Sequence, residues 1–455
     1  MRTSTLLALS LTLSAGVARA EPERAKDPRA DHVVLVSIDG LRPEFYLDPS
    51  WPAPTLQRLA KEGVRAQAVR GVFPSVTYPS HTTLITGALP ARHGIVNNEP
   101  FEPEGQTGRW YWDASEIKAR TLWHAVQDAG LESASISWPV SVGAPVTRNL
   151  PEVWSLSAGI GGTAPIRSAS TPPGLMEEIE REATGNLRDD NYSMNLASRD
   201  LRVGLAAGYL LRTYRPALLT VHLTGPDHVM HAVGRQGPEV AQAVALADAA
   251  LATLVEDARR AGILERTAFV VTGDHGFVDT HTRVCPNVWL AEAGLQGSAP
   301  DRGAWRATFH CSGGSALLRL ADPADAAAVE VVRGLLAELP PGVRKTFRVI
   351  EPAQLRELGA DPDAALALSA FEGYRFSSSA RGKALQAGRG GTHGYFPDFQ
   401  RIHTGFVGWG AGFAEDVLVP RLDLEDVAPV VAELLGIGFE APDGVLPIGL
   451  LRAAR

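Results

Sequence analysis

Six acidic and imidazole side chains in this sequence have the types and positions that suit metal binding. Five of them come shortly after segments with the pattern of a buried strand, and the sixth stands in a glycine-flanked loop. Functional groups gather at the carboxyl ends of the strands in an open parallel sheet, so these side chains are expected to meet. Three carboxylates and three imidazoles suffice for two zinc ions with three protein ligands each. The six are Asp39, Asp227, His231, Asp274, His275 and His393.

Each of these side chains also has an ordinary structural alternative. An aspartate before glycine suits a turn or a helix cap, and an Asp–His pair spaced i, i+4 suits a surface ion pair. The loop histidine could simply be solvated. The joint pattern favours a metal site, because three strand ends deliver the same ligand chemistry. His228, one position after Asp227, would point elsewhere and is not expected to be a ligand.

Oxygen and nitrogen donors without thiolate suit Zn²⁺, with Mn²⁺ or Fe²⁺ as alternatives. Cys285 and Cys311 are the two cysteines of the chain, too few for a thiolate zinc site. In an exported protein they are expected to form one disulfide, which would stabilise the fold by roughly 3 kcal/mol. In a reducing cytosol they would be inert thiols.

A pair of metal ions about 4 Å apart can bind the attacking and leaving oxygens of a phosphoryl displacement, which also needs a nucleophile. Thr77 lies just before the helix-like segment 80–87, where free backbone N–H groups face an anion, although a plain helix cap would look the same. The amide of Asn98 could stabilise a phosphoryl oxygen, or stand in a turn. The hydroxyls that compete with Thr77 are Ser75, Ser80, Thr82 and Thr83.

Alternating strand and helix patterns predict an α/β fold with a mostly parallel central sheet and helices on both faces. The predicted strands are 33–38, 132–138, 217–225, 267–273 and 403–410. The predicted helices are 55–63, 120–130, 239–262 and 423–438.

The segment 278–392 interrupts this alternation and is interpreted as an insertion or cap subdomain within one catalytic domain, 21–455. Inside it, 314–320 and 346–350 have strand patterns, and 324–339 has a helix pattern.

The composition excludes some classes of protein, and the N-terminal segment indicates the compartment in which the protein acts. The 455 residues are 45% hydrophobic and 21% charged, which excludes a disordered polyelectrolyte, and the net charge of -8 argues against a large nucleic-acid surface. Residues 1–20 have the pattern of a signal peptide, with a buried helix as the alternative. No later run reaches 18 uninterrupted apolar residues, so no transmembrane segment is expected after signal removal. The mature protein is expected to be periplasmic or secreted.

Seven segments, in order along the chain, resemble the nucleotide pyrophosphatase/phosphodiesterase family of the alkaline phosphatase superfamily. They are SIDGLRPEFYL (37–47), PTLQRLAKEGV (54–64), FPSVTYPSHTTLITGALPARHGIVNN (73–98), SWPVS (137–141), PDHVMHAVG (226–234), TGDHGF (272–277) and GTHGY (391–395). The resemblance implies an alkaline phosphatase-like fold.

The resemblance also implies a role for each matching residue. Thr77 would be the nucleophile that is transiently phosphorylated. Asn98 and the backbone N–H of Tyr78 would bind the phosphoryl oxygen, and the Tyr78 ring would line a pocket for a nucleobase or another leaving group. One zinc ion would be held by Asp227, His231 and His393. The other would be held by Asp39, Asp274, His275 and the Thr77 oxygen.

The implied activity is that of an exported two-zinc enzyme that hydrolyses small phosphodiesters or nucleotide pyrophosphates. Alternatives are a phosphonoacetate hydrolase-like enzyme or phosphomonoesterase of the same superfamily, and a non-catalytic exported zinc-binding protein. The chain departs from the family pattern near the pocket, at Tyr78, Ser80, Val140 and Met230, which leaves the substrate preference open. A sulfatase is less consistent, since neither cysteine occupies a position comparable to Thr77.

Overall fold

The structure is a computed structural model that describes residues 24–25, 27–154, 162–297 and 304–453. The predicted signal peptide, 1–20, lies outside the described residues.

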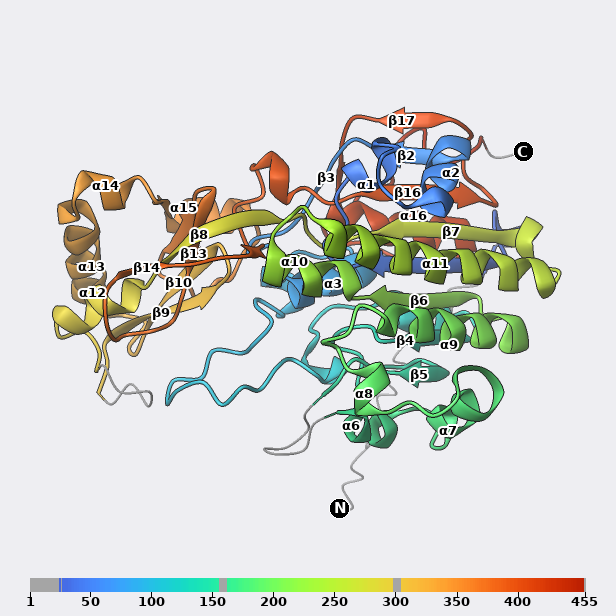
Figure 1. The fold of residues 1–455 in the computed structure, drawn as a ribbon, viewed down its shortest axis with the longest axis horizontal. Helices are drawn as coiled ribbons and strands as arrows, with labels where there is room; N and C mark the ends of the chain where they lie inside the picture. The colour runs from blue at the N-terminus through green and yellow to red at the C-terminus, as the bar shows by residue number, and fades with distance from the viewer. Residues whose placement is uncertain (1–23, 26, 155–161, 298–303, 454–455) are drawn as a thin grey trace, which may run out of the picture.

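An eight-stranded sheet forms the centre of the molecule (Figure 1). In spatial order its strands are β17 (Val417–Val419), β2 (Val64–Ala66), β16 (Phe406–Gly410), β7 (Thr267–Thr272), β1 (His32–Ile38), β6 (Leu218–Leu223), β4 (Ser133–Ile136) and β5 (Arg148–Leu150). β1 runs parallel to both β6 and β7, and β16 runs antiparallel to its two neighbours. The prediction of a mostly parallel sheet is therefore confirmed.

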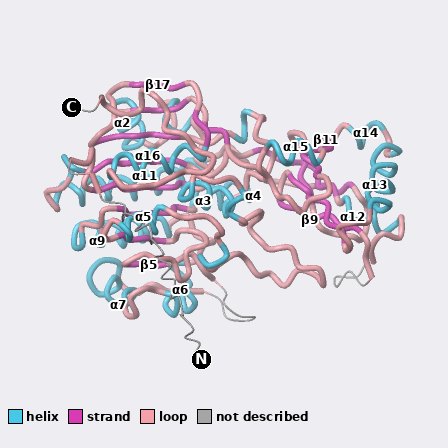
Figure 2. The backbone as a smooth tube through the Cα atoms, turned by 180° about the vertical axis from the view of Figure 1, so that it is seen from behind, coloured by secondary structure: helices cyan, strands magenta, loops and turns pink. Residues whose placement is uncertain are grey.

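Helices cover both faces of this sheet, as predicted (Figures 1 and 2). The apolar run of β1 is buried on both sides: Val34 and Val36 belong to one hydrophobic cluster, and Val33 and Leu35 belong to another. The first cluster is completed by α2 (Pro54–Glu62), α9 (Arg199–Tyr214) and α11 (Pro238–Arg260). The second is completed by α3 (Thr77–Thr86), α5 (Leu122–Asp128) and α16 (Val427–Leu435).

Helix α11 is, among the described helices, the one long and apolar enough to cross a membrane by length and composition alone. Its apolar side packs into the first hydrophobic cluster through Val240, Leu251 and Leu254, and it lies against α9 (Figure 1). These contacts are those of a core helix.

Residues 278–392 form two smaller sheets beside the central one (Figure 1). The first has the order β11 (Phe347–Ile350), β12 (Ala367–Ala370), β10 (Ser315–Leu320) and β9 (Ala307–Ser312). In the second, β8 (Val278–Val284) pairs with β13 (Gly373–Phe376), β14 (Leu385–Ala387) and β15 (Gly391–Thr392). Nearby helices are α12 (Pro286–Glu292), α13 (Ala326–Glu338), α14 (Pro341–Arg344) and α15 (Pro352–Glu357). The interpretation of this segment as a cap subdomain within one domain remains a prediction.

Several short elements complete the described chain. The helices are α1 (Glu44–Leu47), α4 (Pro90–His93), α6 (Thr163–Ala169), α7 (Leu175–Ile179), α8 (Asp189–Tyr192) and α10 (Gly225–Val233). A two-stranded sheet joins β3 (Val69–Arg70) to β18 (Leu422–Asp423).

The disulfide expected between Cys285 and Cys311 is not formed, and in the described chain both residues are free thiols. Cys285 precedes α12, and Cys311 lies in β9. The Cys311 thiol donates to the carbonyl oxygen of Phe309, 3.7 Å away, and so is directed toward its own strand. The prediction of a disulfide is wrong for this structure.

The contact between α9 and α11 depends on Gly204, whose added Cβ would lie 2.8 Å from Cα of Ala250. Gly204→Ala should therefore lower the free energy of unfolding by about 1–3 kcal/mol, because the two helices must separate. Gly334→Ala in α13 is the matched control: its Cβ would meet nothing within 4 Å, and alanine is the better helix former. In urea denaturation, the free energy of unfolding should fall for Gly204→Ala and rise for Gly334→Ala. Equal changes in the two variants would contradict the close packing of α9 on α11.

Candidate active site

The central sheet brings the three predicted acidic ligands to one edge. Asp39 follows β1, Asp274 follows β7, and Asp227 lies in the first turn of α10, directly after β6. Because β1 pairs in parallel with both β6 and β7, the three carboxyl ends are neighbours. In Figure 1, α10 and β8, which follow β6 and β7, lie on the side of the smaller sheets.

Close approach of the chain at this edge depends on Gly273. A Cβ there would lie 2.6 Å from Cβ of Leu41 and 2.9 Å from the carbonyl oxygen of Ile38. Such distances are sterically forbidden, so only glycine lets the end of β7 pack against the loop after β1. The result is that Asp274 stands beside Asp39.

One candidate metal group consists of Asp39, Asp274 and His275, all buried. His275 Nε2 lies 3.3 Å from Asp39 Oδ1 and 3.1 Å from Asp274 Oδ2. One donor atom from each residue lies within 4.8 Å of the others. These are the three protein side chains that the sequence assigned to one zinc ion.

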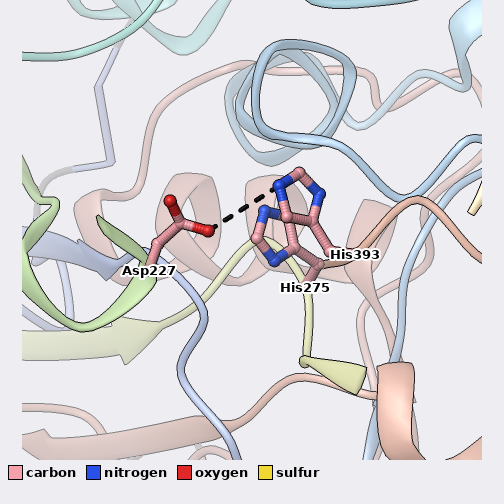
Figure 3. Close-up of side chains that lie close together, drawn as sticks. All are labelled: Asp227, His275 and His393. Carbon is pink, nitrogen blue, oxygen red and sulfur yellow. Dashed lines mark ion pairs between the residues drawn. The ribbon is translucent and has the colours of Figure 1, made fainter. Parts of the chain in front are cut away.

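A second candidate group consists of Asp227, His275 and His393 (Figure 3). His393 Nε2 lies 3.7 Å from Asp227 Oδ1, and the rings of His393 and His275 stack with centroids 3.6 Å apart. His231, the third residue assigned to this ion, has Nε2 3.3 Å from Asp227 Oδ1. Its ring centroid is 5.1 Å from that of His393, and it lies outside the tighter group. The structure thus brings all six side chains together, with His275 between the two groups.

The three histidines share one orientation that suits metal binding. Nδ1 of His231, His275 and His393 lies 3.1–3.2 Å from the carbonyl oxygens of Gly391, Gly276 and Ser75, respectively. A carbonyl at Nδ1 fixes the ring and its tautomer and leaves Nε2 free for a metal. The Nε2 atoms are the ones that face the carboxylates.

Buried polar atoms without hydrogen bonds indicate that the site is built for cations. Among the described residues, Asp39 Oδ1, Asp227 Oδ1, Asp274 Oδ2 and His275 Nε2 are buried and lack a hydrogen-bond partner. Leaving such groups unsatisfied costs free energy that a bound ion would offset. The donor set of carboxylate oxygen and imidazole nitrogen fits Zn²⁺.

The pKa shifts have the same origin. Burial, together with the charges of Asp227 and Asp274, raises the pKa of Asp39 well above its ordinary value, and burial raises the pKa of Asp274 to about 6. Burial also lowers the pKa of His275 to about 4 and that of His393 to about 3. Neutral imidazoles are the form that binds metal, and a bound cation would favour the ionised form of Asp39 and Asp274.

Zinc added to the metal-stripped protein should raise the thermal midpoint, because an ion that binds the folded state alone stabilises it by about 2.7 kcal/mol at 100 times Kd. Asp274→Asn should lose most of this gain, since it removes a ligand. Glu425→Gln changes a buried carboxyl outside the pocket and should keep the gain. Differential scanning calorimetry at a series of zinc concentrations measures the thermal midpoint of each protein. A wild-type midpoint that does not change with zinc concentration would contradict the proposed metal site.

A pocket of about 480 Å³ opens beside the two metal groups. Thr77, Tyr78 and Asn98 line it together with four of the six predicted ligands, Asp39, Asp227, His231 and His393. The aromatic rings of Trp110, Trp154 and Tyr192 form another part of the wall. His228 also lines the pocket but belongs to neither metal group. None of the described lining residues is a lysine or an arginine.

The structure separates Thr77 from the competing hydroxyls. Thr77 lines the pocket, whereas the hydroxyl of Ser75 donates to the carbonyl of Tyr395 and that of Thr82 donates to the carbonyl of Tyr78. Thr83 is hydrogen-bonded to His93, and Ser80 is fully buried. None of these four lines the pocket.

Helix α3 begins earlier than the predicted segment 80–87. Val76 is the N-cap in extended backbone, and Thr77 is the first helical residue. Proline is tolerated in the first turn of a helix, so Pro79 does not delay the start to Ser80. Thr77 therefore lies at the N-terminal end of the helix, next to the pocket, although the N–H groups of Tyr78 and Ser80 in this turn already have acceptors.

The two groups predicted to bind a phosphoryl oxygen are hydrogen-bonded to each other. The backbone N–H of Tyr78 donates to Asn98 Oδ1 at 2.9 Å. With Oδ1 engaged, Asn98 Nδ2 is the amide donor available to a substrate. The Tyr78 N–H would have to share or exchange its acceptor to take the predicted role.

Sequence reasoning missed His222 and Glu152, which also line the pocket. Both are almost fully buried, and His222 lies between Glu152 and Asp39. A histidine inside the otherwise apolar strand 217–225 was the available signal. Glu152, in a loop, had none.

Comparisons with known proteins agree with this geometry. A sequence model described as type I phosphodiesterase/nucleotide pyrophosphatase matches residues 33–396. Ectonucleotide pyrophosphatase/phosphodiesterase family member 7 of Homo sapiens is 26% identical over 261 residues, which are 55% of this chain and 49% of that protein. Family member 3 of Rattus norvegicus is 24% identical over 261 residues, 54% of this chain and 25% of that protein. The matched part of the chain thus spans from a quarter to half of these relatives.

Solved structures show the same fold. Human ectonucleotide pyrophosphatase/phosphodiesterase 5 has a TM-score of 0.66 with 20% identity, over 91% of this chain and 97% of that one. The murine protein, solved in complex with AMP, gives the same values. The expected alkaline phosphatase-like fold is confirmed by this similarity.

Proposed function

Because the chain belongs to the type I phosphodiesterase/nucleotide pyrophosphatase family, we propose that it hydrolyses phosphodiester or phosphoanhydride bonds of small nucleotide-like substrates. The observation that carries the proposal is that one pocket holds the Thr77 hydroxyl and the edge of two carboxylate–imidazole groups. The complex of the murine relative with AMP supports a nucleotide-derived substrate.

In this proposal Asp39, Asp274 and His275 hold one zinc ion, and Asp227, His231 and His393 hold the other. Bound zinc supplies Lewis-acid stabilisation of negative charge on oxygen. The proton of the Thr77 hydroxyl passes to solvent, and Thr77 Oγ forms a bond to phosphorus while the bond from phosphorus to the leaving oxygen breaks; that oxygen departs as an anion or takes a proton from solvent. Water then attacks phosphorus and releases Thr77 Oγ. Two displacements leave the configuration at phosphorus unchanged.

The remaining pocket residues have positioning roles. Asn98 Nδ2 donates to a non-bridging phosphoryl oxygen, whose charge grows as Thr77 attacks. The rings of Tyr78, Trp110 and Trp154 contact an aromatic or apolar group of the substrate. No lysine or arginine is among the described lining residues, so the pocket has no such side chain to balance the second negative charge of a monoester. A monoanionic diester therefore suits the pocket better than a dianionic monoester.

The proposal also covers where the protein acts and whether it spans a membrane. The signal-like residues 1–20 support export, to a periplasm or out of the cell. The core packing of α11 supports a chain without a membrane-spanning helix after signal removal.

Thr77→Ala should abolish turnover, by about 10³-fold or more in kcat, because it removes the attacking oxygen. It should keep bound zinc and the thermal midpoint, since each of the two proposed ions keeps its three acidic or imidazole ligands. Thr82→Ala, which removes a hydroxyl from the same helix outside the pocket, is the control and should stay active. Wild-type rates in Thr77→Ala would place the nucleophile elsewhere.

The p-nitrophenyl ester of thymidine 5′-monophosphate should be hydrolysed with a kcat/KM at least about tenfold above that of p-nitrophenyl phosphate, because the monoester carries an additional charge. Release of p-nitrophenolate measures both, with zinc content determined on the same sample. A preference for the monoester, or for phosphonoacetate, would favour the alternative activities of the superfamily. Bound zinc without turnover of any of the three would favour a non-catalytic zinc-binding protein.

A further inference from the structure

A chain of buried polar groups runs from the metal ligand Asp39 to the far wall of the pocket. Its centre is His222, which is the penultimate residue of β6 and fully buried. His222 Nε2 lies 3.2 Å from Asp39 Oδ2, and His222 Nδ1 lies 2.8 Å from Glu152 Oε2. Each ring nitrogen of His222 thus lies within hydrogen-bond distance of one carboxyl group.

Glu152 is held in place from three sides. Its Oε1 accepts the hydroxyl of Tyr78 at 3.1 Å, and its Oε2 lies 3.4 Å from the hydroxyl of Ser137. Arg199 donates to the same Ser137 oxygen at 2.7 Å. Ser137 has a φ of 60°, a backbone conformation that a non-glycine residue rarely adopts. A residue held in a strained conformation beside a buried polar network is typical of a functional constraint.

The two oxygens of Asp39 have different surroundings as a result. Oδ2 faces His222, whereas Oδ1 lies 3.3 Å from His275 Nε2 and has no hydrogen-bond partner among the described residues. When one carboxyl oxygen is held by a hydrogen bond, only the other oxygen can bind a metal ion, and the carboxyl group can no longer rotate freely.

We propose that His222 and Glu152 are positioning residues: His222 orients Asp39 toward its metal ion, and Glu152 orients His222 and the Tyr78 side chain together. The pair thus links the metal centre to the wall that contacts the substrate. This inference rests on the metal centre of the proposed function, yet its readout is zinc affinity and does not require turnover.

Two substitutions at the same position separate the two ring nitrogens. His222→Gln places an amide donor near the position of Nε2 and keeps the hydrogen bond to Asp39. His222→Asn places its donor near Nδ1, so it can reach Glu152 but not Asp39. In chelator competition with metal-stripped protein, His222→Asn should bind one of two zinc ions 10–100-fold more weakly, and His222→Gln should stay within a few-fold of wild type.

A matched control is His93, another fully buried histidine, which is bonded to Thr83 and does not line the pocket. His93→Asn reports the general cost of replacing a buried imidazole and should leave both zinc affinities unchanged. Glu152→Gln should lower the affinity for the same zinc ion as His222→Asn does. Tyr78→Phe removes only the hydroxyl bonded to Glu152, so it should raise KM for the nucleotide diester while zinc affinity stays constant.

Wild-type zinc affinity in His222→Asn would overturn the inference, as would equal losses in His222→Asn and His222→Gln. Equal losses in His222→Asn and His93→Asn would show a merely structural role and also overturn it. If the wild-type protein binds zinc but hydrolyses no phosphodiester, the proposed function fails while the positioning result stands on its own. If the wild-type protein binds no zinc, both are wrong.

Discussion

The convergence of three carboxylates, two of them buried, at one edge of the sheet is the constraint on which this structure depends. Asp39, Asp227 and Asp274 meet at the edge of the sheet, where burial raises the pKa of Asp39 and of Asp274. Burial acts in the same direction on Asp227, but the neighbouring His231 and His393 outweigh it and lower the pKa of that carboxyl. Hydrogen bonds within the described chain leave an oxygen of each carboxylate unsatisfied. A protein keeps such a cluster only when a partner offsets its cost, and divalent cations are the partners that fit these donors.

Several features of the fold hold the three carboxylates close together. The parallel pairing of β1 with β6 and β7 brings the acids to one place, and Gly273 permits the close approach. The segment 278–392 also takes part, because its last strand, β15, leads directly into His393. The carbonyl of Gly391 in the same strand faces His231. Folding of this segment and completion of the metal centre are therefore coupled.

The sequence predicted the elements that have a strong pattern. The continuous apolar runs at 33–38 and 267–273 became buried strands, and the residues after them became the core of the site. The start of α3 was misplaced: the predicted segment began at Ser80, whereas the helix begins at Thr77 and accepts Pro79 in its first turn. The disulfide prediction failed because a count of two cysteines does not show how their thiols are directed, and the Cys311 thiol donates to the carbonyl oxygen of Phe309.

The polar network behind the pocket lay beyond sequence reasoning for a related reason. His222 interrupts an apolar strand, and nothing local indicates that its partners are Asp39 and Glu152, which lie 183 and 70 positions away. Such contacts arise from topology. Of the hydroxyls that competed on sequence grounds, Thr77 is the one that lines the pocket, which the sequence could not show.

The most direct test of the central claim is a crystal structure of the zinc-loaded protein with anomalous scattering collected at the zinc edge. The account predicts two strong anomalous peaks, one in contact with Asp39, Asp274 and His275, and the other in contact with Asp227 and His393. Thr77 Oγ should face them. Peaks elsewhere on the chain, or none in crystals grown with excess zinc, would contradict it.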